Sequence, residues 1–411
     1  MGTGKRRTAI GFGPGILVTA AFIGPGTITT ASSAGAHFGY ALIWALLFSV
    51  FATIVLQEMS ARLGLVTREG LAEAMRSHFR SPLFGNLAVV LIVAAVGLGN
   101  AAYEAGNIAG AALALTTVSP VGSGTWSLLI GLGAGLLLAS GRYRVLEGVL
   151  IALVLVMSIV FLLTAILVAP SLGEIVASLL PPQLPPGSVM TVIALIGTTV
   201  VPYNLFLHAN SVREKWSAEI PLGDAIRASR LDSGLSIGLG GLITLAILST
   251  AAAAFFGTGL VFDGGSLALQ LEPLLGPAAR YVFAAGLFAG GLTSAITAPL
   301  AASYAVCGAM GWRNSLHGRG FRLVWATVLL TGTTFAALGS KPLTAILFAQ
   351  MANGLLLPVV AVFLLTVMNS KALLGEYRNG PAANLLGSAV VLVAVALGLV
   401  KLLGVLGLLQ A

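Results

Sequence analysis

The stretch that decides the fold reads Ala20-Ala-Phe-Ile-Gly-Pro-Gly-Thr-Ile-Thr-Thr30, which places Gly24-Pro25-Gly26-Thr27 inside an apolar run. Proline removes a backbone donor and clashes with the preceding turn, and glycine costs a helix about 1 kcal/mol relative to alanine. Within a membrane, freed backbone groups must find partners, so unwound helix is tolerated where it lines a site. The stretch therefore predicts a helix that is broken at its centre.

The composition of the whole chain indicates the surroundings of that helix. Only 8% of the 411 residues are charged, whereas soluble domains carry about 25%. Hydrophobic residues make up 57%, and the mean hydropathy is +1.01. These values exclude a water-soluble enzyme, a disordered protein and a nucleic-acid-binding domain. Because the apolar runs are too long for β-barrel strands, we predict an all-α polytopic protein of the bilayer.

Counting the apolar runs gives eleven predicted spans, each near the ~20 residues that a crossing requires. The predicted spans are 13–36, 40–63, 84–116, 125–140, 145–169, 187–210, 231–256, 274–308, 320–338, 343–368 and 383–408. The connections are too short for a soluble domain, so 1–411 is predicted to be a single transporter-type domain. The outer connection 170–186 contains Pro181, Pro182, Pro185 and Pro186 and is expected to be extended.

The distribution of basic residues orients these spans. With a cytoplasmic N-terminus, the segments predicted to be inner hold all of the 21 Lys and Arg residues except Arg280, Lys341 and Lys401. The inner set is Lys5, Arg6, Arg7, Arg62, Arg68, Arg76, Arg80, Arg142, Arg144, Arg213, Lys215, Arg227, Arg230, Arg313, Arg319, Arg322, Lys371 and Arg378. This asymmetry predicts a multi-pass protein of the cell's inner (plasma) membrane, with the C-terminus outside.

A second break lies in the sixth span, in the stretch Gly197-Thr-Thr-Val-Val-Pro-Tyr-Asn204. One such break is explained equally well by a simple proline kink. Two breaks separated by five helices are typical of transporters with inverted five-helix repeats, whose substrate sites lie at the broken helices. We therefore expect repeats at 13–169 and 187–368 and an additional helix at 383–408.

Several motifs resemble the Nramp family of proton-coupled divalent-metal transporters. The matching stretches are Gly35-Ala-His-Phe-Gly-Tyr40, Gly110-Ala-Ala-Leu-Ala-Leu115, Leu271-Glu-Pro-Leu-Leu-Gly-Pro277 and Leu374-Gly-Glu-Tyr-Arg-Asn379. The resemblance covers most of the chain and implies a LeuT-type fold. It also implies roles for Glu104 and Asn107 in proton movement, for His208 in the sixth helix, and for Gln350 as a tenth-helix residue of the substrate site.

The chain departs from the family at both breaks. The family's first-helix motif Asp-Pro-Gly-Asn is Gly24-Pro25-Gly26-Thr27 here, and its sixth-helix motif Met-Pro-His is Val201-Pro202-Tyr203. The carboxylate, amide and thioether that would bind a transition metal are therefore replaced, while the helix-breaking residues remain. No residue is assigned to a resident metal, and no cofactor is expected.

The predicted substrate follows from these replacements. The expected binding residues are Gly24, Pro25, Gly26, Thr27, Thr198, Thr199, Val201, Tyr203, Asn204 and Gln350, all of them neutral. An unpaired buried charge is costly, so a bare divalent ion is disfavoured, although a hydrated Mg²⁺ is less so. A restarting half-helix, with Thr27 as its expected N-cap, favours an anion. A small anion such as bicarbonate is the first prediction, and Mg²⁺ or Mn²⁺ the alternative.

The remaining polar residues concern coupling. Glu104 lies inside the bilayer, where a carboxylate is by default a functional candidate, so it could carry H⁺ or bind Na⁺. A structural hydrogen bond to Asn100 or Tyr103 is its other interpretation, and His208 is either packed or a proton relay. No nucleophile or metal motif indicates an enzyme. A secondary transporter of a small inorganic ion with a coupled cation is predicted, a channel is its rival, and the oligomeric state stays open.

Overall fold

A computed structural model describes residues 23–78, 86, 89–140, 144–170, 172–179, 181–312, 314–339 and 341–405. Within these ranges every regular element is a helix. The first half contains α2 (Pro25–Phe38), α3 (Ile43–Thr67), α4 (Leu71–His78), the π-helix η1 (Val93–Leu98), α6 (Gly99–Thr116), α7 (Ser123–Ser140), α8 (Arg144–Val168) and α9 (Leu172–Ala177).

The second half contains both long helices and short helical turns. They are α10 (Val189–Thr199), α11 (Pro202–Lys215), α12 (Leu222–Phe255), η2 (Leu267–Leu271), α13 (Glu272–Leu275), η3 (Gly276–Ala278), α14 (Ala279–Met310), α15 (Arg319–Leu338), α16 (Pro342–Met368), α17 (Lys371–Leu374), η4 (Gly375–Tyr377) and α18 (Pro381–Val405). Among the described residues, ten helical segments are long and apolar enough to cross a membrane.

These segments correspond one to one with the second to eleventh predicted spans, and α2 is the described part of the first. The all-α prediction is therefore confirmed. Residues 13–22 of the first span lie outside the described ranges, as do Lys5, Arg6, Arg7, Arg80, Arg142 and Arg313 of the charge pattern and the end of the last span.

Two connections differ from the prediction. The 170–186 connection is not extended throughout, because α9 forms between Pro170 and Pro181, in a stretch that contains no proline. The 211–230 connection is mostly helical, since α11 continues to Lys215 and α12 already begins at Leu222. Polar residues end the apolar run there without ending the helix, because Arg, Lys, Glu and Ala all favour helix.

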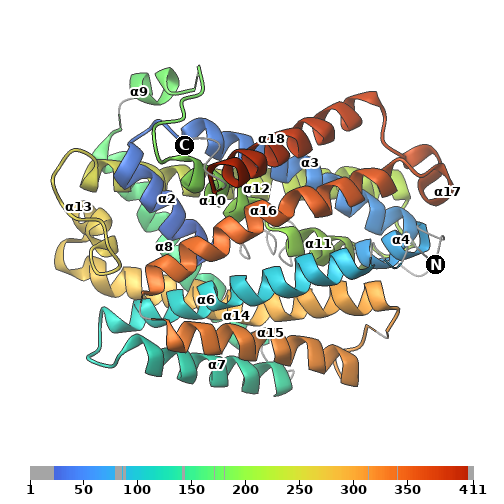
Figure 1. Cartoon of the computed structure of the whole chain (residues 1–411), viewed down its shortest axis with the longest axis horizontal. Coiled ribbons are helices and arrows are strands. Elements are labelled where there is room, and N and C mark those ends of the chain that lie inside the picture. Colours follow the sequence, from blue (N-terminus) through green and yellow to red (C-terminus); the bar gives the residue numbers. More distant parts are fainter. Residues whose placement is uncertain are drawn as a thin grey trace, which may run out of the picture.

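The helices are arranged in layers about a central group. Figure 1 shows α7 and α15 along one edge and α18 along the opposite edge, with α6, α14 and α16 between them. The outer helices expose leucines such as Leu132 (63% exposed), Leu330 (66%) and Leu392 (67%). Exposed apolar side chains on outer helices are expected where lipid is the solvent. The chain is thus a multi-pass membrane protein.

The connections gather at two ends of the molecule. In Figure 1, α4 and α17 lie at one end and α9 and α13 at the other. The first pair belongs to connections predicted to be inner and the second pair to connections predicted to be outer. The alternation required by the span count is therefore present.

Close helix crossings depend on glycine at particular points. Gly35 of α2 lies against α12, where a Cβ atom would meet the Leu248 carbonyl oxygen and come within 2.9 Å of the Ala252 nitrogen. These are backbone atoms, which cannot rotate away as a side chain can. Gly238, in contrast, has open space around its missing side chain.

We predict that Gly35→Ala lowers stability by about 1–3 kcal/mol, because overpacking forces the two helices apart. The matched control Gly238→Ala should be neutral or stabilising by up to about 1 kcal/mol, since alanine is the better helix former. Thermal unfolding of the purified protein measures both. Equal melting temperatures for Gly35→Ala and wild type would contradict the close α2–α12 crossing.

Candidate functional site

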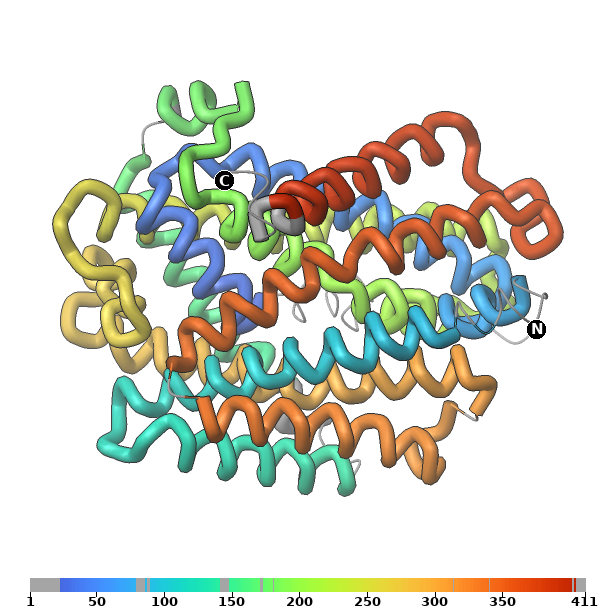
Figure 2. The backbone as a smooth tube through the Cα atoms, in the orientation of Figure 1, coloured from blue at the N-terminus to red at the C-terminus, as the bar shows by residue number. Residues whose placement is uncertain are grey.

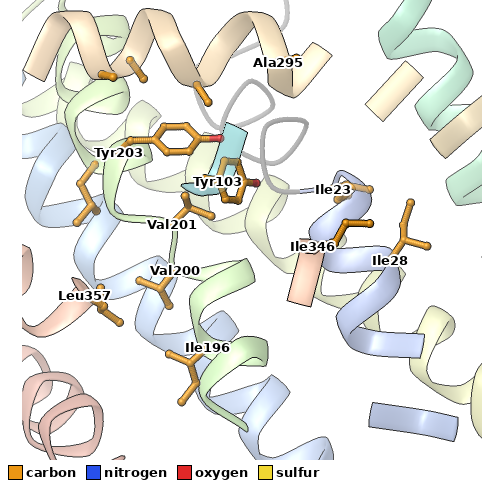
Figure 3. Close-up of a cluster of buried hydrophobic side chains, with 14 of the residues drawn as sticks. Ile23, Ile28, Tyr103, Ile196, Val200, Val201, Tyr203, Ala295, Ile346 and Leu357 are labelled. Atoms are coloured by element: carbon orange, nitrogen blue, oxygen red, sulfur yellow. The ribbon is translucent and has the colours of Figure 1, made fainter. Parts of the chain in front are cut away.

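The break in the sixth span is an extended link between two helices. α10 ends at Thr199, α11 begins at Pro202, and Val201 has extended backbone angles (φ −76°, ψ 119°). The Val200 amide donates to the Ile196 carbonyl oxygen at 2.8 Å, which closes the first helix. Pro202 occupies the first turn of the second, where its missing donor has no cost. Figure 3 shows Val200 and Val201 on this link.

In the first span, a helix begins at the corresponding place. Gly24 is extended (φ −130°, ψ −168°) and precedes α2, which begins directly at Pro25. The Ile28 amide donates to the Gly24 carbonyl oxygen at 3.1 Å. The expectation that Thr27 is the N-cap is therefore wrong. Proline presets the helical φ at the first position and starts the helix three residues before the predicted one.

A contact between two hydroxyl groups joins the start of α2 to the end of α10. Thr27 Oγ1 lies 2.9 Å from Thr198 Oγ1, and both residues are buried. The Thr199 hydroxyl instead donates to the Leu195 carbonyl oxygen of its own helix at 3.0 Å. Of the two predicted threonines in α10, Thr198 thus faces α2, while Thr199 binds its own helix.

Helix α16 brings an amide to the same place. A Cβ atom at Gly26 would collide with the side-chain amide of Gln350, so Gln350 lies directly on the first turn of α2. Figure 2 shows the start of α2, in dark blue, beside α16, in orange. On the other side of the break, a Cβ at Gly24 would lie 3.0 Å from Ser294 Oγ of α14. The expected residues of α2, α10 and α16 are therefore neighbours.

We call the place where the start of α2, the link between α10 and α11, and Gln350 of α16 come together the junction. Several buried polar atoms at the junction have no hydrogen-bond partner. They are both amide atoms of Asn204, both amide atoms of Gln350, the Tyr203 hydroxyl, Ser294 Oγ and Asn353 Nδ2. These five side chains are each at most 2% exposed. Buried polar groups normally find partners, so a cluster of unpaired ones indicates a place where a ligand or water completes the bonding.

Ser294 and Asn353 are absent from the predicted site. Asn353 lies three residues after Gln350 on α16, a spacing that puts both on one helix face, so the sequence held a signal for it. Ser294 sits in a run of small residues on α14, and nothing in that run distinguishes it from packing positions.

Glu104 and Asn107 form a pair on α6 near the junction. Asn107 Nδ2 donates to Glu104 Oε2 at 3.2 Å, while Oε1 has no partner. The expected alternative partners Asn100 and Tyr103 make no hydrogen bond to this carboxylate among the described residues. Tyr103 instead packs edge-on against Tyr203, with ring centroids 5.3 Å apart, as Figure 3 shows. The two tyrosines thus connect the α11 break to the helix that carries Glu104.

The π-helical turn η1 directly precedes this part of α6. Such turns place an extra residue in a helix and occur frequently at functional sites. The helix that carries Glu104 is therefore irregular in the turn before α6 begins. The apolar sequence of residues 93–98 did not indicate this irregularity.

His208 lies farther along α11, in a separate network. Its Nδ1 is 2.7 Å from Gln57 Oε1, and its Nε2 is 3.3 Å from Ser233 Oγ. Because an amide oxygen only accepts, Nδ1 carries a proton in this arrangement. His208 is six residues beyond Pro202, about 9 Å along a helix, so the structure does not bring it to the junction.

The junction is neutral in the described part of the chain. No group of three or more His, Cys, Asp or Glu residues that could hold a metal ion occurs there. What the junction offers is amide oxygens and nitrogens, hydroxyl groups and the free backbone of two helix ends. Such groups can bind either a cation through oxygen or an anion through N–H and O–H.

Comparison with known proteins places the chain in a family. The model of the family described as "Natural resistance-associated macrophage protein-like" (Nramp) matches residues 15–404. The Divalent metal cation transporter MntH 1 of Pseudomonas aeruginosa is 31% identical over 392 residues, covering 91% of this chain and 87% of the relative. The MntH of Bradyrhizobium diazoefficiens is 30% identical and covers 92% and 85%.

Solved structures agree on the architecture. The manganese transporter of Eremococcus coleocola has a TM-score of 0.77 at 25% identity, over 95% of this chain and 85% of that one. MhsT, solved with L-phenylalanine, has a TM-score of 0.60 at 15% identity, over 95% and 97%, which shows a shared LeuT-like fold alone. The chain is therefore no enzyme, and it belongs to the Nramp family of secondary transporters.

Proposed function

We propose that this protein transports a divalent metal cation, Mg²⁺ or Mn²⁺, which it holds through neutral oxygen atoms while the ion keeps part of its water shell. The observation that carries the proposal is the set of four unpaired amide atoms of Asn204 and Gln350 at the junction of the two breaks. Family membership and the divalent-metal transporters among the relatives support it. The anion, predicted first from the sequence, receives no support from those relatives.

The ligand chemistry favours hard ions. Amide, hydroxyl and carbonyl oxygens suit Mg²⁺ and Mn²⁺, whereas softer metals prefer sulfur or imidazole. Mg²⁺ dehydrates reluctantly and usually retains several waters. Retained water spreads the charge of the ion, so a neutral site can bind it without a facing carboxylate. Val201, in place of a thioether, fits this preference.

A small anion such as bicarbonate, moved with H⁺ or Na⁺, is the second candidate. One observation favours it: α2 begins at Pro25, directly beside Gly24, with no acidic residue in its first turn. The free N–H groups of a helix start attract negative charge. A channel is the third, because broken helices also line pores; saturable counterflow would exclude it.

The remaining assignments belong to the same proposal. We place the N-terminus in the cytoplasm and the C-terminus outside the plasma membrane, from the charge distribution. We divide the chain into inverted repeats at about 13–169 and 187–368 plus a last helix at about 383–408. Thr27, Thr198 and Tyr203 complete the substrate site with the two amides, and Glu104, Asn107 and His208 form the pathway of the coupled H⁺ or Na⁺.

We expect Gln350→Ala and Asn204→Ala to raise the KM for Mn²⁺ or Mg²⁺ uptake into proteoliposomes at least about tenfold. Each removes a direct oxygen ligand, and a lost bond to a charged group costs about 1.5–3 kcal/mol. Gln183→Ala makes the same change at an exposed outer position and should leave uptake unchanged. Uptake of labelled bicarbonate, saturable and without metal uptake, would overturn the cation proposal.

Gly24→Asp separates the cation from the anion. If the site holds a cation, a carboxylate at this break should lower the KM for Mn²⁺ about tenfold or more. If the site holds an anion, the same carboxylate should abolish the uptake of labelled bicarbonate. Ser294→Ala is combined with it, because the new Cβ would lie 3.0 Å from Ser294 Oγ. Metal uptake that falls in the double variant, relative to Ser294→Ala alone, would count against the cation.

Glu104→Gln tests coupling. Glutamine keeps the shape and the bond to Asn107 but cannot carry a proton or bind Na⁺ through a charge. We expect accumulation of substrate against its gradient to lose its dependence on H⁺ or Na⁺, while downhill flux persists. Glu272→Gln, an exposed acid of the outer segment, is the control. Unchanged coupling in Glu104→Gln would make that carboxylate structural.

A further inference from the structure

A second cluster of unpaired polar atoms lies away from the junction. Glu73 Oε2, Asn210 Oδ1 and Asn314 Oδ1 are buried atoms without a hydrogen-bond partner. Glu73 belongs to α4, Asn210 to α11, and Asn314 to the segment between α14 and α15. All three are oxygens, and none of the predicted site residues is among them.

The two amides are fixed with their oxygens free. Asn210 Nδ2 donates to the Phe206 carbonyl oxygen at 2.9 Å, one turn earlier on α11. Asn314 Nδ2 donates to Glu73 Oε1. Since each amide nitrogen already has its acceptor, the unpaired oxygens are not a matter of amide orientation. Asn210 is 4% exposed, so water outside the protein does not satisfy it.

The oxygens gather around one point in the fold. A Cβ atom at Gly70 would touch Glu73 Oε2 and lie 3.0 Å from Asn210 Oδ1. A Cβ at Gly308 of α14 would lie 2.7 Å from Glu73 Oε2. Glycine at both positions leaves room beside the carboxylate. Asn314 approaches the same carboxylate from its other oxygen.

Because this cluster consists of oxygen acceptors, its partner must be a cation or a hydrogen-bond donor. The cluster contains three acceptors and one formal negative charge, and the ion pairs seen in the described part of the chain include Arg62–Glu58, Arg227–Asp224 and Arg230–Glu58. Glu73 takes part in none of them. A single water could donate to two of the oxygens and would leave the carboxylate charge uncompensated.

We propose that Glu73, Asn210 and Asn314 form a binding site for a monovalent alkali cation of the Na⁺ class. One carboxylate neutralises one such ion, whereas divalent ions in proteins usually collect more oxygen ligands and charges. The bound ion would fasten α11, the half-helix that follows the second break, to α4 and to the segment after α14. The site is separate from the substrate junction and stands or falls independently of it.

The test compares melting temperatures of the purified full-length protein in NaCl and in choline chloride at equal ionic strength. We expect Na⁺ to raise the melting temperature of the wild type by about 2 °C or more. Glu73→Gln should abolish the shift without unfolding the protein, because its amide can donate to Asn210 Oδ1 in place of the ion. Glu69→Gln, an exposed acid two residues before α4, should keep it.

A second variant keeps the result interpretable. Asn314→Asp adds a negative charge to the site, so its melting temperature should fall in choline and recover by more than the wild-type shift in Na⁺. The proposal is overturned if the wild type does not respond to Na⁺, if Glu73→Gln responds as Glu69→Gln does, or if only Mg²⁺ or Ca²⁺ produces the shift. Gln350→Ala should have the raised KM for metal uptake expected above yet retain the Na⁺ shift, which separates this site from the substrate site.

Discussion

The rest of the structure depends on the need to pair every backbone polar group inside a membrane. Helix α10 ends at Thr199 within one predicted span and α2 begins at Pro25 within another, and helix ends of this kind free carbonyl and amide groups where water is scarce. Pro25 and Pro202 reduce that cost, because each sits at a helix start where its missing donor would be unpaired anyway. The remaining groups need neighbours, and the α16 amide of Gln350 lies directly on the first turn of α2.

Close approach of these neighbours explains the glycines around the junction. Gly197 of α10 lies on the Gln350 carbonyl, and Gly110 of α6 lies on the ring of Pro25, at distances that no side chain would allow. The helices therefore pack closely around the breaks, where the expected substrate residues are all neutral. Under the proposed cation function, the charge of the ion is compensated by retained water and by the more distant Glu104, so the proposal links substrate binding to coupling.

The fold could be predicted from the sequence because its signals are local and strong. Apolar runs, prolines and the asymmetry of basic residues indicated eleven spans and both breaks. Helix ends were predicted less well: Thr27 was expected as a cap where Pro25 already starts the helix, and α12 extends nine residues before its predicted start. Capping and polar helix extensions depend on tertiary neighbours, which hydropathy does not record.

The site was predictable only in part, for a related reason. Asn204 and Gln350 stand out as amides in apolar runs, and the structure leaves both unpaired at the junction. Ser294 resembles any other small residue of a membrane helix, and the contact between Tyr103 and Tyr203 joins residues a hundred positions apart. The oxygen cluster at Glu73 was missed because its members come from α4, from α11 and from the segment between α14 and α15, whose proximity only the folded chain establishes.

Anomalous scattering from crystals grown with Mn²⁺ tests the central claim most directly, because it locates the ion without reference to transport. We expect one strong peak between the two helix breaks, within bonding distance of the Asn204 and Gln350 amide oxygens, with ordered water completing its shell. No peak at saturating Mn²⁺, or a peak confined to the acidic residues outside the junction, would contradict a cation site built from neutral oxygens.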